Sequence, residues 1–144
     1  MTRHDDTQKH ASDPVAQYFA ERGVPDEVRR TGLAGIIAKW TAIAGTAARY
    51  DLTLDDWLND VDLRDIIAGA VTAAPESERN TIREALDRAD TLFRAATVAT
   101  KRSMSGDAVA SADNHDPHHQ WWYFRRPANP GETMREDLAE AGIS

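Results

Sequence analysis

Hydrophobic side chains recur every three or four residues through most of the chain, the spacing that places them on one face of an α-helix. A first helix is expected to begin at Pro14, behind a capping side chain of Ser12 or Asp13, and to end at Gly23. Its apolar face holds Val15, Tyr18 and Phe19. Residues 1–12 offer nothing to bury, so we expect them to form a flexible arm.

The longest apolar pattern runs from about Pro25 to Tyr50 and predicts a single long helix. A second face of this helix consists of small residues: Gly32, Gly35, Ala38, Ala42, Gly45 and Thr46. Each glycine inside a helix costs about 1 kcal/mol relative to alanine. That cost is tolerated where another helix packs closely against the small residues, or where the helix breaks.

The middle of the chain, Leu54 to Ile67, combines many aspartates with a regular apolar spacing, and we expect two short helices there. Thr53 caps the first, and Asp56 can reach back to complete the cap. Asp62 is in position to cap the second, from Leu63 to Ala74.

Ser77 to Thr100 repeats the helical spacing, with oppositely charged side chains four residues apart. Residues 101–120 show no periodicity, which predicts a long loop and leaves disorder open. Trp121 to Phe124 is expected to be an extended segment pressed onto the helices. Glu132 to Ala141 is expected to form a last helix, with Met134, Leu138 and Ala141 facing inward and Gly142 as its cap.

These elements predict an all-α fold: a compact bundle of about five helices with the aromatic segment packed across it. Residues 13–144 are expected to form a single helical domain, because a chain of 144 residues is most simply organised around one core.

The composition removes several classes of function. The chain has no cysteine, which excludes disulfide frameworks, thiolate metal sites and thiol nucleophiles. The window Thr31 to Ala48 is apolar enough to suggest a short membrane span, but Lys39 lies at its centre, so we place it in the core. Met1 to Asp13 shows no secretory signal, and we expect a cytoplasmic protein that does not associate with membranes.

The run from His115 to His119 contains side chains that bind zinc or nickel. Its spacing matches no rigid ligand pattern and it lies in the expected loop, so we assign no metal and no cofactor. The central aspartates lack the spacing of a calcium loop, and capping, solvation and ion pairing account for them without catalysis. We therefore assign no catalytic residue, and expect Asp60, Arg64 and Asp65 to pair with the 77–100 helix.

Trp121 to Arg126 joins aromatic side chains to arginines, the composition of a platform for stacking nucleic-acid bases. The formal net charge of −7 and the acidic surroundings of this segment disfavour such a partner. Arg125 and Arg126 are instead expected to pair with the aspartates of residues 55–65.

Leu54 to Asp65, Trp121 to Pro127 and Asn129-Pro130-Gly131 together resemble a group of small bacterial helical proteins. Those proteins share an acidic central motif and an aromatic tail containing Pro-Gly. The resemblance covers Val28 to the C-terminus, with the loop excepted. It implies a helical protein and no particular activity.

The acidic middle of the chain favours a non-enzymatic interaction or regulatory protein, similar in kind to an immunity protein or antitoxin, with a basic protein as partner. The alternative is a small-molecule-binding protein or a metal-assisted enzyme, with a site between residues 55–65 and Trp121 to Arg126. A homodimer through the small-residue face is a further expectation. The residues expected to carry the interaction are Asp55, Asp56, Asp60, Arg64, Asp65, Trp121, Trp122, Arg125 and Arg126.

Overall fold

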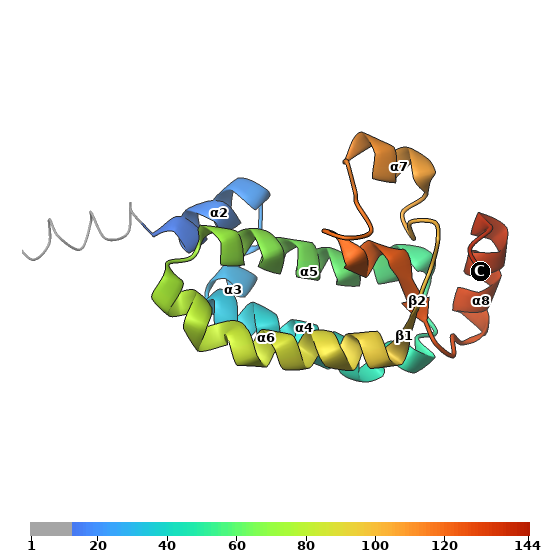
Figure 1. The fold of residues 1–144 in the computed structure, drawn as a ribbon, viewed down its shortest axis with the longest axis horizontal. Coiled ribbons are helices and arrows are strands. Elements are labelled where there is room, and N and C mark those ends of the chain that lie inside the picture. Colours follow the sequence, from blue (N-terminus) through green and yellow to red (C-terminus); the bar gives the residue numbers. More distant parts are fainter. Residues whose placement is uncertain (1–12) are drawn as a thin grey trace, which may run out of the picture.

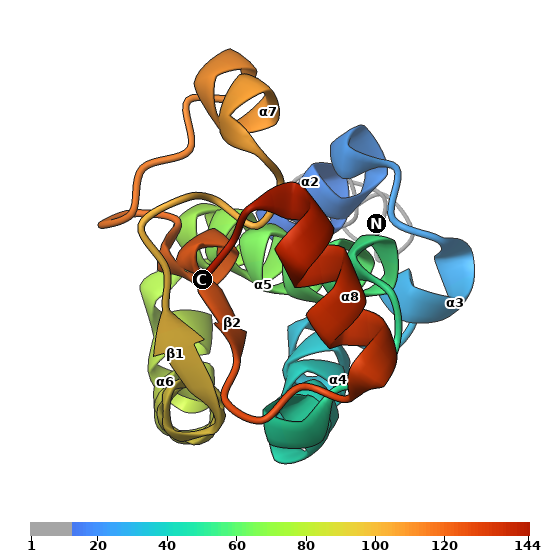
Figure 2. The ribbon, with the colours of Figure 1, turned by 90° about the vertical axis from the view of Figure 1, so that its right-hand side faces the viewer.

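A computed structural model describes residues 13–144, which form an all-α fold, as the sequence predicts. The body of the fold consists of α4 (Gly32–Thr46), α5 (Leu54–Ala73) and α6 (Glu76–Ala96), which run lengthwise (Figure 1). Seen end-on, these helices form a three-cornered bundle, with α8 (Glu132–Ala141) crossing one end (Figure 2). The arm expected at residues 1–12 lies outside the described part of the chain.

The first described helix, α2 (Pro14–Arg22), has both of its predicted caps. The carboxylate of Asp13 accepts the N–H groups of Val15 and Ala16, at 3.1 and 3.2 Å. Gly23 ends the helix in the left-handed region, with φ of 71°. The helix packs on α5 at Gly69, where a Cβ atom would collide with the hydroxyl of Tyr18.

The expected single helix from Pro25 to Tyr50 is wrong. A short helix, α3 (Asp26–Arg29), is followed by a turn, and α4 begins at Gly32, whose φ is +67°. Residues with a side chain rarely adopt that conformation, so the glycine marks a break in the helix. The C-terminal end of the pattern tightens into a 3₁₀ turn, η1 (Ala47–Arg49).

The expected pair of helices at Leu54 to Ala74 is also wrong, because α5 runs unbroken from Leu54 to Ala73. The predicted capping box is present: the N–H of Asp56 donates to Thr53 Oγ1 at 3.1 Å, and the N–H of Thr53 donates to Asp56 Oδ2 at 3.2 Å. Asp62 does not cap a helix. It lies in the middle of α5, where an unbroken helix keeps Trp57 and Val61 on one fully buried face.

The helix predicted for Ser77 to Thr100 exists but ends at Ala96. The chain continues as β1 (Thr97–Ala99), which pairs antiparallel with β2 (Arg125–Pro127). Trp121 to Phe124 is a 3₁₀ turn, η2, and not the expected extended segment. Extended pairing begins one residue later, at Arg125, because a strand partner is available there.

Residues 101–120 were expected to form a loop, but they contain a short helix, α7 (Asp107–Ala112). It stands away from the bundle in both views (Figures 1 and 2), and none of its residues is buried. The last helix, α8, ends at Gly142 as predicted and buries Met134 and Leu138, whereas Ala141 is exposed.

The core is aromatic at its centre: Trp40, Trp57 and Phe93 have no exposed surface. Phe93 lies 4.6 Å from Trp40 and 5.7 Å from Trp57, measured between ring centroids. By contrast, Ala38 and Ala42 on the small-residue face of α4 are exposed. Of the two explanations for the small residues, close packing by another helix is not seen at these two positions, whereas a break in the helix is present at Gly32.

Candidate functional site

The aromatic turn η2 lies on α5, which brings the Trp121 to Arg126 segment beside the acidic stretch. The sequence predicted this neighbourhood, and it is confirmed. Two hollows border the contact. One is lined by Asp62, Asp65 and Tyr123, and the other by Arg64 and the two tryptophans of η2.

The first hollow, which we name the acidic cleft, has a volume of about 500 Å³. It lies between α2, α5 and the segment that runs from Ser105 to Tyr123. The polar side chains that give it chemical character are Arg22, Asp62, Asp65, Asp113, His115 and Tyr123. Carboxylates therefore outnumber the fixed positive charge in this cleft.

Tyr123 forms one wall of the acidic cleft, and its hydroxyl donates a short hydrogen bond to Asp62 Oδ1. The ring of His115 stacks on Tyr123, with 4.1 Å between centroids and 9° between planes. Burial raises the pKa of Tyr123 well above its usual range, and the bond to Asp62 raises it further. The phenol therefore stays protonated and acts as a donor that holds Asp62 in place.

At the other side of the cleft, Arg22 pairs with Asp65 at 3.2 Å and donates to the Tyr18 hydroxyl at 2.8 Å. About a third of the Arg22 side chain is exposed, so this pair contributes little to stability. Its effect is to orient the Asp65 carboxylate toward the cleft. Asp65 was expected to pair with an arginine of the 77–100 helix, and that expectation is wrong.

Arg64 does pair with α6, as predicted, but its partner is Asp90. Its Nε and Nη2 atoms donate to the two carboxylate oxygens of Asp90 at 2.9 and 3.0 Å. The Trp40 indole donates to Asp90 as well, at 2.9 Å. The guanidinium carbon lies 4.7 Å from the centre of the Trp122 ring. This buried pair links α4, α5, α6 and η2.

The remaining aspartates of the predicted set do not converge with these groups. Asp60 accepts the Tyr50 hydroxyl at 2.6 Å, and Asp56 is used in the helix cap. Asp55 is exposed near Asp137 of α8. The acidic stretch thus points in several directions and does not form one continuous patch.

Arg125 and Arg126 were expected to pair with the aspartates of residues 55–65, and this is wrong. Arg125 donates to Thr97 Oγ1 at 2.7 Å and to the Arg94 carbonyl at 3.2 Å, which fastens β2 to the end of α6. Arg126 donates to the Pro127 carbonyl at 2.8 Å. Both arginines therefore bond to groups of the short sheet and of the end of α6, and not to an aspartate of residues 55–65.

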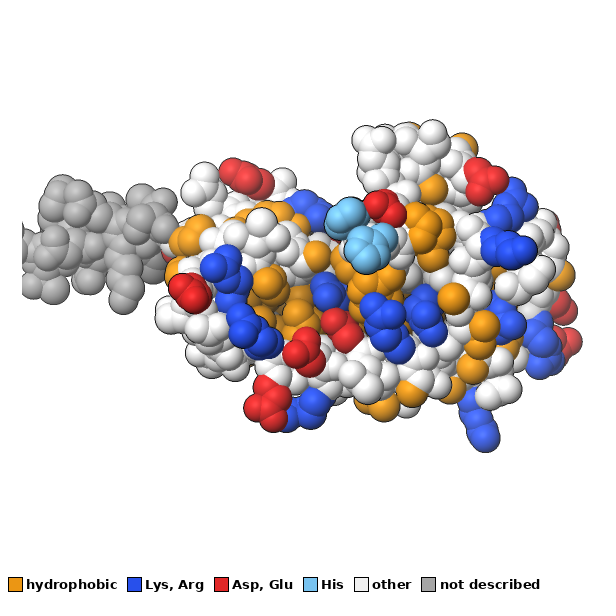
Figure 3. Space-filling model, in the orientation of Figure 1, with side chains coloured by type: hydrophobic (Ala, Val, Ile, Leu, Met, Phe, Trp, Pro, Cys, Tyr) orange, Lys and Arg blue, Asp and Glu red, His pale blue; other side chains and the backbone are white. Residues whose placement is uncertain are grey.

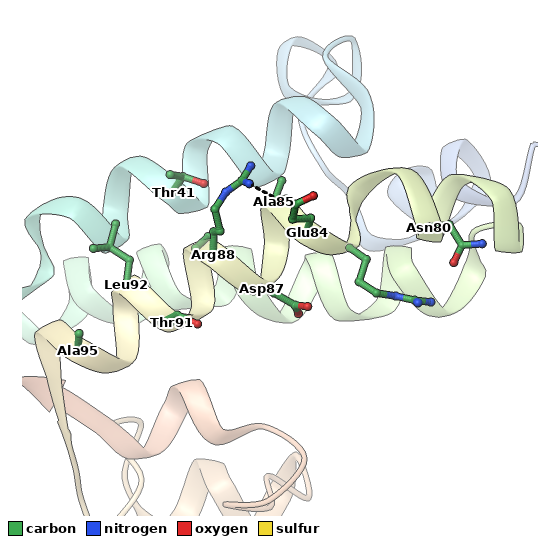
Figure 4. A pocket seen from close by; sticks show the side chains of 11 residues that line it. Thr41, Asn80, Glu84, Ala85, Asp87, Arg88, Thr91, Leu92 and Ala95 are labelled. Carbon is green, nitrogen blue, oxygen red and sulfur yellow. Dashed lines mark hydrogen bonds and ion pairs between the residues drawn. The ribbon is translucent and has the colours of Figure 1, made fainter.

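A larger hollow of about 900 Å³ runs along the outer face of α6 (Figure 4). Glu84 and Arg88 pair there at 2.9 Å, while Asn80 and Asp87 point elsewhere (Figure 4). Its polar side chains do not converge on a common point, so its size alone does not make it the candidate site.

The histidine run, residues 115–119, is organised around Asp116. Within residues 13–144, no group of three or more histidine or acidic side chains is placed to hold a metal ion. His119 Nδ1 bonds to Asp116 Oδ2 at 2.7 Å, and the His118 N–H donates to Asp116 Oδ1 at 2.9 Å.

Within residues 13–144, none of the helices combines the length and the hydrophobicity of a membrane span.

Sequence reasoning did not identify Arg22, His115 and Tyr123 as members of one site. Arg22 carries no local signal, because only the packing of α2 on α5 brings it to Asp65. His115 was noted only as a potential metal ligand, and Tyr123 only as part of an aromatic run. One signal was available in the sequence. Arg64 and Asp65 are adjacent on α5, and adjacent residues of a helix point in different directions, so the two side chains were bound to face different neighbours.

Comparison of the chain with protein-family models, with curated proteins and with solved structures found no match. The resemblance to small bacterial helical proteins therefore stays a prediction, and the function has to be argued from the site.

The three tyrosines give a pH test of this site and of the core. Burial is the main cause that raises the pKa of Tyr18, Tyr50 and Tyr123 above the ordinary value of 10.0. The unfolded chain loses its phenol protons near pH 10, whereas the folded protein keeps them, so stability falls as the pH rises above about 10. Absorbance at 295 nm is expected to show little tyrosinate at pH 10 in the native protein and half-ionised tyrosine in the chain unfolded in urea. Equal titration of both forms would contradict the assigned burial.

Proposed function

We propose that this chain is a non-enzymatic binding protein whose acidic cleft receives a cationic group, an ammonium or a guanidinium. The observation that carries the proposal is the grouping of Asp62, Asp65 and Asp113 in one concave site with Arg22 as the opposing fixed charge. Such a site favours positive charge, and carboxylates bind ammonium and guanidinium groups through charge-assisted hydrogen bonds.

The geometry of the cleft supports recognition. Asp62 accepts a hydrogen bond from Tyr123 on Oδ1, and Asp65 is bonded to Arg22 through Oδ2. Each carboxylate therefore keeps acceptor capacity while its orientation is fixed, which lowers the entropic cost of binding a donor. The aromatic rings of Tyr123 and His115 add a wall against which the carbon chain of an amine can pack.

The same side chains argue for binding over catalysis. A general base works best with a pKa near the operating pH, and the pKa of Tyr123 is shifted away from that range. Asp62 is held by a hydrogen bond and Asp65 by an ion pair. This favours the interaction protein that the sequence suggests, with its acidic surface reduced from the whole 55–65 stretch to this cleft.

The cationic group has two potential sources, a free small amine or a lysine or arginine side chain of a partner protein. The test is therefore a titration of ¹⁵N-labelled protein with 1,4-diaminobutane and, separately, with a lysine-containing tripeptide blocked at both ends. Amide shifts around Asp62, Asp65 and Tyr123 report binding at the cleft. Tighter binding of the peptide identifies a protein partner, and tighter binding of the diamine identifies a small ligand.

Asp62→Asn is expected to weaken binding of the preferred cation about 10- to 150-fold, because a charge-assisted hydrogen bond contributes about 1.5–3 kcal/mol. Asp87→Asn, an exposed change on α6, removes the same charge far from the cleft and is the matched control. Binding that both variants weaken equally reflects net charge alone and contradicts the proposal. No cleft shifts with either cation would also contradict it.

A further inference from the structure

The chain leaves the bundle after Met104 and returns to it at His115, and α7 lies on this excursion. Figure 3 shows the excursion as a protrusion that stands clear of the body of the molecule, in the orientation of Figure 1. None of the residues of α7 is buried, and Val109 is 45% exposed. Val109 and the nearby Asp113 nevertheless line the acidic cleft. The excursion therefore forms one wall of that cleft, although α7 contributes nothing to the core.

Both ends of this excursion are fixed on Tyr123. Before α7, the N–H of Met104 donates to the Tyr123 carbonyl at 2.8 Å, and Met104 is only 1% exposed. After α7, the His115 ring stacks on the Tyr123 ring. The helix between these two points can therefore change its tilt toward the cleft without moving a residue of the core.

Residues with positive φ stand at the two ends of α7. Gly106, directly before the helix, has φ of 90°, and Asn114, shortly after it, has φ of 55°. These are the two residue types that adopt such angles most readily. A Cβ atom at Gly106 would meet no other atom within 4 Å, so the space around this turn is open. Hinges are a few residues at the ends of an element that absorb changes of φ and ψ, and Gly106 and Asn114 have that position.

The cleft combines its carboxylates with aliphatic side chains. Leu58, Asp62 and Asp65 follow one another at four and three residues on α5, so they share one face of the helix, and all three line the cleft. A cation held at these carboxylates therefore has Leu58 within the next turn. Val109 lines the same cleft from α7, and Leu58 and Val109 are the two aliphatic side chains among its described lining residues.

We propose that α7 is a lid, which closes over the hydrocarbon part of the bound cation and places Val109 opposite Leu58. The inference rests on the proposed function and names its ligand class: an ammonium carried on an alkyl chain, as in an aliphatic amine or a lysine side chain. A ligand shifts a conformational equilibrium only by its difference in affinity for the two states. An alkyl chain supplies that difference, because Val109 covers its methylene groups only in the closed form. A cation without a chain binds the open and closed forms alike.

The experiment compares n-butylammonium with methylammonium, which carry the same charge and differ by three methylene groups. Each methylene group taken fully out of water strengthens binding about fourfold. We expect about a tenfold preference for butylammonium, because the closed lid covers part of the chain. Amide shifts of Asp62 and Asp65 in ¹⁵N-labelled protein give the two affinities. Isotope-filtered NOEs from the butyl chain to the methyl groups of both Leu58 and Val109 report the closed lid.

Val109→Thr keeps the shape of the side chain and replaces one methyl group by a hydroxyl. We expect it to reduce the preference for butylammonium from about tenfold to about threefold, while methylammonium binding stays unchanged. Val98→Thr is the matched control, because Val98 is 41% exposed and lies on β1, outside the lining of the cleft. Both substitutions are at exposed positions, so neither removes a core contact.

The outcomes separate the lid from the proposed function. Three results would overturn the lid and leave the acidic cleft as a cation site: equal affinity for the two amines, no NOE to Val109, or an undiminished preference in Val109→Thr. A preference that Val98→Thr reduces as much as Val109→Thr would also overturn it. If neither amine shifts Asp62 and Asp65, the proposed function fails and the lid fails with it.

Discussion

Replacing Asp90 with alanine is expected to lower the free energy of unfolding by about 3–5 kcal/mol, because it leaves a buried charge without its partner. Asp90 accepts two hydrogen bonds from Arg64 and one from the Trp40 indole. The side chains of Arg64 and Asp90 are 10% and 16% exposed, so water cannot replace these bonds. The loss should be measured by urea unfolding followed by circular dichroism.

A double variant separates the charge from the packing. Arg64→Met combined with Asp90→Asn removes both charges and keeps an acceptor for the Trp40 indole. We expect it to recover most of the stability that Asp90→Ala loses, because exchanging a buried ion pair for neutral groups is often close to neutral. If the double variant is as unstable as Asp90→Ala, the damage comes from lost packing and the account of the buried charge is wrong.

Phe93→Ala is expected to cost about 3–5 kcal/mol, the range for removing a buried phenylalanine ring. Phe93 has no exposed surface and lies between Trp40, Trp57 and Trp121, with its ring centroid 4.6, 5.7 and 6.0 Å from theirs. Its removal leaves a cavity walled by rigid indoles, which cannot collapse to fill it. Thermal unfolding should show the loss as a large decrease in Tm.

The neighbouring residue on α6 supplies the control. Leu92 is 44% exposed, so Leu92→Ala should change stability by about 0.5 kcal/mol or less. A similar loss in both variants would contradict the placement of Phe93 at the centre of the core and Leu92 at its surface.

Local chemistry was enough to predict several helix ends. Asp13, Gly23, Thr53 and Gly142 act as the caps that their residue types favour, since a capping side chain needs only its own neighbours in sequence. The helical content followed from the hydrophobic period for the same reason. Two of the errors came where a glycine or an aspartate has two local uses, at Gly32 and Asp62.

The sequence predicted which segments meet at the candidate sites, but not which side chains pair there. The sequence placed the Trp121 to Arg126 segment beside residues 55–65 because Arg125 and Arg126 were expected to pair with the aspartates there. The neighbourhood is confirmed, but that pairing is wrong. Sequence reasoning assigned the wrong partners to Asp65 and Arg125, since the identity of a partner depends on how α2 packs on α5 and how β1 meets β2.

The sequence by itself determined the all-α class, the caps and the acidic character of α5, because each depends on residues close together in the chain. Only the tertiary structure decided that Asp62 and Asp65 share a cleft with Arg22, His115 and Tyr123, and that Arg64 faces a different pocket. These groups come from segments up to about a hundred residues apart. Their meeting depends on the packing of whole helices, which one-dimensional periodicity does not encode.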